Sequence, residues 1–235
     1  MLATDAPPTA DHRLGRPLLL VAVVLALAVP LLGRDALFSA DEGAAVAQAR
    51  LLQEGRGWGL DHPLPSVDPE GRAFPLQYAS PVARPEGEPA AAPFAKHPVY
   101  AALLVPFDRV GGVLGMTLTS VLGTLVAALV AGLLTRRLDP AAAPVAVVVT
   151  GLATPLLFDA WLVIAHSLGA ALAGLAVLAV LRTDEGRGGP AVLATAAAVG
   201  AAVLLRNEAV LFGVALGVTA IVVGVATLAL GLALV

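Results

Sequence analysis

The stretch 113–137, VLGMTLTSVLGTLVAALVAGLLTRR, decides the fold of this protein. Residues 113–134 contain no charged side chain, and the basic pair Arg136 and Arg137 follows almost at once. About 20 consecutive apolar residues suffice for a helix to cross the hydrocarbon core of a bilayer. Basic residues collect on the cytoplasmic side of such helices. The stretch therefore predicts a transmembrane helix whose C-terminal end faces the cytoplasm.

The composition of the whole chain agrees with a membrane environment. Of its 235 residues, 58% are hydrophobic and 13% are charged, whereas soluble domains are about 45–50% apolar and about 25% charged. The net charge of −3 gives no reason to expect a nucleic-acid partner. The absence of cysteine excludes disulfides and thiolate metal sites. We therefore expect an all-α polytopic protein of the plasma membrane.

The first apolar run, 17–33, sets the orientation of the chain. Arg13 and Arg16 precede it, so residues 1–16 are expected to be a cytoplasmic N-terminus. A cleaved signal peptide is the alternative reading of this run. With this span leading outward and the next one returning, residues 34–112 form a large extracytoplasmic loop.

The segment 113–235 is predicted to hold the second to sixth spans. After the first of these, four apolar runs alternate in direction: 140–158, 161–181, 190–205 and 209–235. This order places Arg182 and Arg187 on the cytoplasmic side, as the distribution of basic residues in such proteins requires. The last run reaches Val235 with no polar tail, so we expect this bundle to be truncated.

The outer loop is expected to contain juxtamembrane helices. Ser39 and Glu42 have the S-x-x-E spacing of a capping box, which predicts a helix that starts there and stops at Gly55. Pro98 suits the first turn of a second helix. That helix would end before Asp108, too soon to span a bilayer, so we expect it to be interfacial or re-entrant.

Asp41 and Glu42 form an acidic pair just outside the first span. Such a pair can supply a general base or a carboxylate ligand for Mg²⁺ or Mn²⁺. The alternative is that Glu42 serves only the capping box and Asp41 only the positive end of the helix dipole.

Lys96 and His97 precede the helix predicted to begin at Pro98. Backbone N–H groups at a helix start, together with a nearby cation, are suited to binding phosphate. The alternative is a solvated cation at the level of the lipid headgroups.

Two further polar pairs stand at the outer ends of predicted spans. His166 lies near the outer end of the fourth span, and Asp159 would lie two turns away if that helix starts early. Arg206 and Glu208 stand at the outer end of the fifth span. Ionisable groups at such positions are often functional; a bond to a neighbouring helix, or a simple helix-end anchor, is the alternative.

Taken together, these motifs resemble the membrane glycosyltransferases of the C-type fold, which include protein O-mannosyltransferases and aminoarabinose transferases. The shared features are the acidic pair after the first span, a basic-Pro-aromatic segment, a Gly-rich joint, a span ending in two arginines and a short R-x-E-A segment. Apart from the Gly-rich joint, which leads into the span, they stand here as Ser39-Ala40-Asp41-Glu42, Lys96-His97-Pro98-Val99-Tyr100, Arg136-Arg137 and Arg206-Asn207-Glu208-Ala209. The resemblance covers about residues 14–215.

The resemblance implies particular roles for these residues. In the family, the acid of the first loop is the catalytic base or a metal-site residue, which implies that role for Asp41, with Glu42 second. The family's basic residue near its P-P motif contacts the lipid phosphate, which implies Lys96, with His97 nearby. This sequence has one proline where the family often has two, and His97 occupies the other position.

The function implied is transfer of a sugar from a polyprenyl-phosphate donor to an acceptor at the extracytoplasmic face of the cell envelope. The partners would be the lipid-linked donor, membrane lipids and a subunit that completes the fold, and the cofactor would be a divalent cation, Mg²⁺ or Mn²⁺. One alternative is a non-catalytic membrane subunit or fragment, and another is a transporter of lipid-linked sugars. The candidate groups gather at one face of the membrane and not at its midplane, which favours the enzyme.

Overall fold

The structure is a computed structural model that describes residues 12–29, 37–56, 59–61, 66, 91–93, 97–182 and 188–233. In these ranges the protein is helical apart from one short pair of antiparallel strands. The elements are α1 (His12–Ala28), α2 (Ala40–Gln53), β1 (Gly59–Asp61), β2 (Ala91–Pro93), α3 (Val99–Leu138), α4 (Ala143–Leu152), α5 (Leu156–Asp159), α6 (His166–Val180), α7 (Gly188–Leu205) and α8 (Ala209–Ala233). The all-α expectation is thus confirmed for the described helices.

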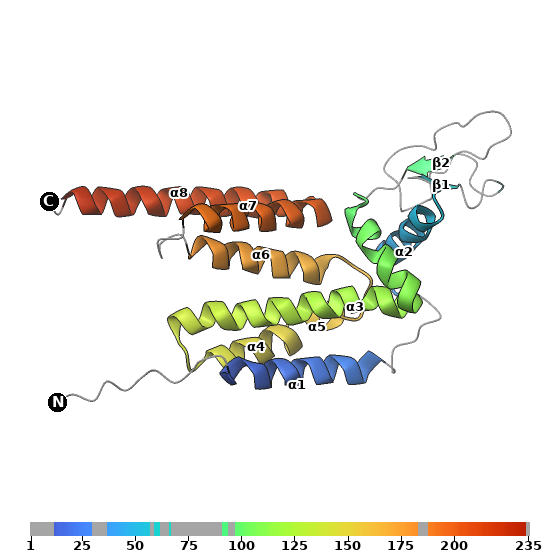
Figure 1. Ribbon diagram of the computed structural model, residues 1–235, viewed down its shortest axis with the longest axis horizontal. Coiled ribbons are helices and arrows are strands. Elements are labelled where there is room, and N and C mark those ends of the chain that lie inside the picture. The colour runs from blue at the N-terminus through green and yellow to red at the C-terminus, as the bar shows by residue number, and fades with distance from the viewer. Residues whose placement is uncertain are drawn as a thin grey trace.

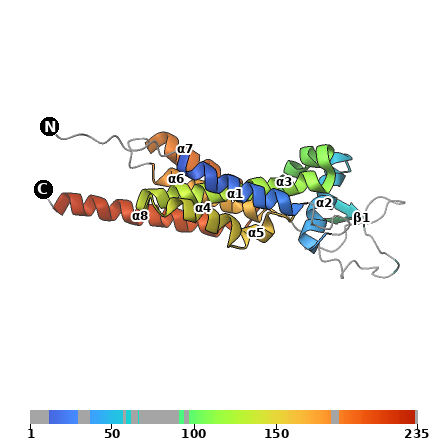
Figure 2. The same cartoon turned by 90° about the horizontal axis from the view of Figure 1, so that it is seen from below.

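Most of these helices lie side by side with their axes roughly aligned (Figure 1), and the view from below shows the same elongated bundle (Figure 2). Helix α2, the start of α3 and the strand pair lie together at one end of the bundle. Successive long helices run in alternate directions, so the start of α6 and the turn between α7 and α8 also reach that end. Segments far apart in the sequence therefore meet there.

The helices occupy the apolar runs of the sequence but do not establish six spans. Among the described residues, α3 is the one helix long and apolar enough to cross a membrane, judged by length and composition alone. Shorter apolar helices occupy the other runs: Leu14–Ala28, Ala143–Leu152, His166–Val180, Gly189–Leu205 and Ala209–Gly224. The number of spans and their orientation remain predictions.

Helix α3 joins two elements that the sequence analysis treats separately. The short helix that starts after Pro98 extends a little beyond Asp108, and the non-helical backbone at Gly112 separates it from the helix over the run 113–134, which shares the label α3. The kink is at Gly112, whose φ of 57° lies in the left-handed region that glycine adopts without steric penalty. The glycine joint predicted before the second span is therefore the point where the chain changes direction.

The run predicted as one span at 140–158 is broken. Helix α4 ends at Leu152, and a separate short turn of helix, α5, begins at Leu156 after Pro155. Proline has no N–H to donate and its ring crowds the preceding turn, so it interrupts a helix. The Thr154 hydroxyl accepts a hydrogen bond from the Leu156 N–H at the break.

Helix α3 packs against α6 through a small residue and a few buried hydroxyls. A Cβ atom added at Gly123 would lie 2.6 Å from the Leu168 nitrogen and 2.7 Å from the Ser167 carbonyl carbon, which are backbone atoms. Close to this contact, the Ser120 hydroxyl donates to the Ile164 carbonyl over 3.0 Å, and the Thr124 hydroxyl donates to the Ser167 hydroxyl over 3.0 Å. Small residues allow helix backbones to approach this closely.

We expect Gly123→Ala to destabilise the protein by about 1–3 kcal/mol, the usual range for overpacking, because the clashing atoms are backbone and cannot rotate away. Gly200→Ala is the matched control, since a Cβ there would meet nothing within 4 Å. Thermal unfolding of both variants in detergent measures the effect. Equal melting temperatures for wild type and Gly123→Ala would contradict the close α3–α6 contact.

Candidate functional site

A pocket of about 150 Å³ lies at the end of the bundle where α2 meets the long helices. Four segments line it: one face of α2, the start of α3, the loop that leads into α6, and the turn between α7 and α8. The lining residues are Asp41, Ala44, Ala45, Gln48, His97, Tyr100, Ala101, Val163, Ile164, Ala165, His166, Leu205, Arg206, Asn207 and Glu208. The structure thus brings together five of the residues selected from the sequence: Asp41, His97, His166, Arg206 and Glu208.

Helix α2 turns one face toward the pocket. Asp41, Ala44, Ala45 and Gln48 are spaced three and four residues apart, which places them on the same side of a helix. The two alanines leave room for the pocket, and the exposed Asp41 stands at N2, in the first turn of α2. A carboxylate there suits the positive end of the helix dipole.

Glu42 does not line the pocket and instead fixes the start of α2. The capping box predicted from the sequence is present: the Ser39 hydroxyl accepts from the Glu42 N–H, and Glu42 Oε2 accepts from the Ser39 N–H over 3.1 Å. Glu42 Oε2 also accepts from the Phe38 N–H over 2.8 Å, and Oε1 accepts from the Val163 N–H over 2.8 Å. With 3% of its surface exposed, Glu42 ties α2 to the loop before α6.

The basic segment before α3 is described only in part. Lys96 lies outside the described residues, so its place relative to the pocket stays a prediction. His97 lines the pocket, and its Nδ1 accepts a hydrogen bond from the Val99 N–H over 3.4 Å. Pro98 is the N-cap of α3, one position before the first helical turn. The imidazole of His97 therefore sits at the helix start, with Nε2 as its other polar atom.

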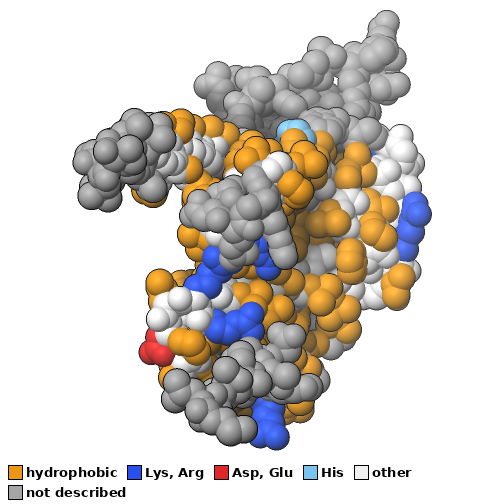
Figure 3. Space-filling model, turned by 60° about the vertical axis from the view of Figure 1, so that its left-hand side comes forward, with side chains coloured by type: hydrophobic (Ala, Val, Ile, Leu, Met, Phe, Trp, Pro, Cys, Tyr) orange, Lys and Arg blue, Asp and Glu red, His pale blue; other side chains and the backbone are white. Residues whose placement is uncertain are grey.

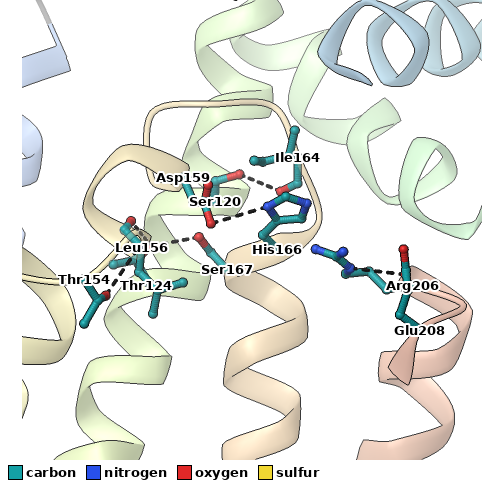
Figure 4. A network of polar contacts seen from close by, with 10 residues as sticks. All are labelled: Ser120, Thr124, Thr154, Leu156, Asp159, Ile164, His166, Ser167, Arg206 and Glu208. Atoms are coloured by element: carbon teal, nitrogen blue, oxygen red, sulfur yellow. Dashed lines mark hydrogen bonds and ion pairs between the residues drawn. The ribbon is translucent and has the colours of Figure 1, made fainter. Parts of the chain in front are cut away.

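His166 and Asp159 are paired, but not on one helix as the sequence suggested. Helix α6 begins at His166, and Asp159 is the last residue of α5. The turn between them brings His166 Nδ1 to 3.4 Å from Asp159 Oδ2 (Figure 4). A carboxylate beside one ring nitrogen fixes the orientation of an imidazole. Asp159 thus contacts the imidazole of His166, which lines the pocket.

Arg206 and Glu208 form the wall contributed by the α7–α8 turn. Arg206 Nε lies 3.5 Å from Glu208 Oε2, and the two side chains stand beside His166 in Figure 4. The Arg206 stem passes close to Gly169, where an added Cβ would lie 3.3 Å from Arg206 Cδ. The absence of a side chain at Gly169 lets the guanidinium lie against the start of α6.

Two buried polar residues of the lining, Gln48 and Tyr100, were not among the candidates selected from the sequence. Both are buried, and the side-chain amide nitrogen of Gln48 and the hydroxyl of Tyr100 have no hydrogen-bond partner among the described residues. A signal for Gln48 was present in the sequence, because it is a polar residue on the face shared by Asp41, Ala44 and Ala45. Tyr100 had been selected only as the aromatic residue of the basic-Pro-aromatic segment, and no role in binding was predicted for it.

In the ranges that the structure describes, no group of three or more His, Asp or Glu side chains is placed to hold a metal ion. Mg²⁺ is often bound by one or two carboxylates together with phosphate oxygens and water. Asp41 as one such ligand remains a prediction.

Comparison with known proteins yields no relative: no protein-family model, curated protein or solved structure matches this chain. The likeness to C-type glycosyltransferases therefore rests on the motifs quoted above, and the roles of the site residues rest on the geometry of the pocket.

Proposed function

We propose that this protein is a polytopic membrane glycosyltransferase that moves a sugar from a polyprenyl-phosphate donor to an acceptor at the extracytoplasmic face. One observation carries the proposal. Residues from four separate segments, which include an exposed carboxylate, two imidazoles and a guanidinium, converge on one pocket at one end of an apolar helical bundle. A carboxylate, imidazoles and a guanidinium at the end of such a bundle are suited to a reaction on the headgroup of a lipid.

The surface of the helices supports a membrane location. Large hydrophobic side chains are exposed along several helices, including Leu19, Leu27, Leu193, Leu211 and Ile221. Exposing so much apolar surface to water is unfavourable, and monomeric soluble proteins rarely have large contiguous apolar patches on their surface. Lipid would solvate these side chains without cost.

The distribution of arginines supports the orientation. The start of α1 and the C-terminal ends of α3 and α6 lie at the end of the bundle away from the pocket (Figure 1). Arg16 is in the first of these helix ends, Arg136 and Arg137 are in the second, and Arg182 follows the third. Figure 3, with that end turned forward, shows Lys and Arg side chains among hydrophobic ones. The Arg137 guanidinium donates to the Leu181 carbonyl over 3.0 Å, which holds two of these ends together. By the positive-inside rule this end is cytoplasmic and the pocket is extracytoplasmic.

The reaction would use the charged groups at the pocket mouth. The acceptor hydroxyl oxygen attacks the anomeric carbon of the donor sugar, and the bond from that carbon to the phosphate oxygen breaks. Asp41 takes the hydroxyl proton as general base. The departing polyprenyl phosphate keeps the electron pair, and Arg206 with His166 stabilises its negative charge. Asp159 orients His166 for this role.

We expect a topology experiment to place the pocket outside the cell. The natural chain has no cysteine, so single cysteines can replace Glu70, Asn207 and Glu185; Glu70 and Glu185 lie outside the described residues. An impermeant thiol reagent added to intact cells should label positions 70 and 207 and leave 185 unlabelled until the membrane is opened. Protection of 70 and 207 with labelling of 185 would invert the orientation.

We also expect Arg206→Ala to weaken binding of polyprenyl phosphate by about 10- to 150-fold, which corresponds to the roughly 1.5–3 kcal/mol of a hydrogen bond to a charged group. Arg136→Ala, at the opposite end of the bundle, is the control and should bind as the wild type does. Lys96→Ala should act like Arg206→Ala if the basic segment reaches the same phosphate. Unchanged affinity in Arg206→Ala would remove this residue from the phosphate site.

A further inference from the structure

The mouth and the floor of the pocket differ in charge. Asp41, His97 and Glu208 are exposed, and His166 and Arg206 are partly exposed, so the ionisable side chains stand toward solvent. The buried lining residues are all neutral: Ala44, Ala45, Gln48, Tyr100, Ala101, Val163 and Ile164. A ligand that fills the pocket would place its charged part at the mouth and an uncharged part at the floor.

Gln48 gives the floor a hydrogen-bond donor that the protein does not use. The residue is 2% exposed, and its Nε2 has no partner in the described part of the chain. A buried polar group without a partner costs about 1–3 kcal/mol, so most such groups in native proteins are satisfied. The exception here lies in a pocket lining, where a ligand oxygen can accept from it.

Tyr100 supplies a second polar group to the floor. It is 7% exposed. The hydroxyls of Thr119 and Ser120 lie near it and donate to the carbonyls of Met116 and Ile164. In hydrogen-bonding geometry the Tyr100 hydroxyl has no partner among the residues described. The lining thus includes an amide nitrogen and a phenol oxygen that are buried and have no hydrogen-bond partner among the described residues.

We propose that this floor is a subsite for one neutral sugar ring, whose hydroxyl oxygens accept hydrogen bonds from Gln48 Nε2 and Tyr100 Oη. The inference rests on the proposed function and specifies the donor's sugar. An amino sugar would bury an ammonium with no carboxylate at the floor to pair with it. A uronic acid would bury a carboxylate with no cation at the floor to pair with it. Hydroxyl groups both accept and donate, and ring C–H groups can pack on the alanines.

The size of the pocket sets the length of the sugar. Its volume of about 150 Å³ is well below the roughly 300–1,000 Å³ of pockets that hold drug-sized ligands. A space of this size matches one sugar ring better than two. The floor therefore favours a donor that carries a single neutral monosaccharide.

The test compares lipids with and without the sugar. The full chain in nanodiscs is titrated with polyprenyl phosphate, with polyprenyl-phosphate mannose, glucose or arabinose, and with polyprenyl-phosphate aminoarabinose. We expect at least one neutral sugar to raise affinity over the bare phosphate, and the amino sugar not to raise it. Gln48→Met and Tyr100→Phe should each lower the affinity for that sugar-loaded lipid by about 5- to 30-fold, because each removes one donor. Both should bind the bare phosphate within about twofold of wild type.

Gln53→Met is the matched control, since Gln53 lies on the same helix, is exposed and does not line the pocket. Thermal unfolding of each variant separates loss of binding from loss of fold, and the conservative replacements keep the side-chain shapes. If all lipids bind equally well to wild type and to both variants, the floor does not bind the sugar and the inference is wrong. The proposed site for the lipid phosphate would be unaffected by that result. Tighter binding of the amino sugar would likewise overturn the inference. If wild type binds none of the lipids, the proposed function itself fails.

Discussion

Asp41→Asn should lower the rate of sugar transfer by about 10²–10⁴-fold, the usual range for the loss of a general base. Asn has nearly the same size as Asp but has no negative charge and cannot take the acceptor proton. Asp41 lies in the first turn of α2 on the face that lines the pocket, whereas Glu42 turns away from it. The change should leave the capping box intact, because Ser39 and Glu42 make it.

The measurement is the initial rate of sugar transfer in membranes, with protein level determined on the same samples. Asp139→Asn is the control, because Asp139 lies between α3 and α4 at the other end of the bundle, where its Oδ1 accepts from the Ala141 N–H and an amide oxygen can do the same. Its rate should match the wild type. A nearly normal rate for Asp41→Asn would show that another group takes the proton.

Glu42→Gln is expected to act on stability. The carboxylate accepts three backbone N–H groups with its two oxygens, one of them from Val163 on a distant loop. A glutamine keeps one acceptor oxygen and places an NH₂ against the N–H groups that the other oxygen served. Leaving buried donors unpaired costs about 1–3 kcal/mol, and each kcal/mol is worth roughly 2–4 °C in Tm for a chain of this size.

Comparison with Ser39→Ala separates the two duties of Glu42. That variant loses the cap but keeps the bond to Val163, and should lose about 0.5–2 kcal/mol. Glu42→Gln should be less stable than Ser39→Ala and should retain much more transfer activity per folded molecule than Asp41→Asn. If Glu42→Gln unfolds at the wild-type temperature and loses activity as completely as Asp41→Asn, Glu42 is catalytic and the division of roles is wrong.

The sequence predicted those features that depend on short spacings. The S-x-x-E pattern at Ser39 and Glu42 located the start of α2, and the Gly-rich joint noted in the family resemblance coincides with the kink at Gly112. Capping and φ > 0 are local requirements, so a few residues are enough to reveal them. The break between α4 and α5 at Pro155 was not predicted, because residues 140–158 contain no charged side chain and are long enough for one span.

The site depends on contacts that no local pattern contains. Asp159 and His166 were expected to meet along one helix, but they meet across the turn between α5 and α6. The Val163 N–H that binds Glu42 lies 121 positions away in the chain. The roles of Gln48 and Tyr100 depend on which buried donors remain unpaired after packing, and that follows only from the assembled structure.

The most direct test of the central claim is sugar transfer in sealed vesicles of known orientation that contain this protein. Polyprenyl-phosphate donors with a radiolabelled neutral monosaccharide are presented on one side at a time, and free polyprenyl phosphate is measured with the labelled product. We predict release of polyprenyl phosphate, matched by transferred sugar, only when the donor headgroup is on the extracytoplasmic side, and its loss in Asp41→Asn. No release above that of vesicles without the protein, on either side and with every donor, would contradict the assignment as a glycosyltransferase.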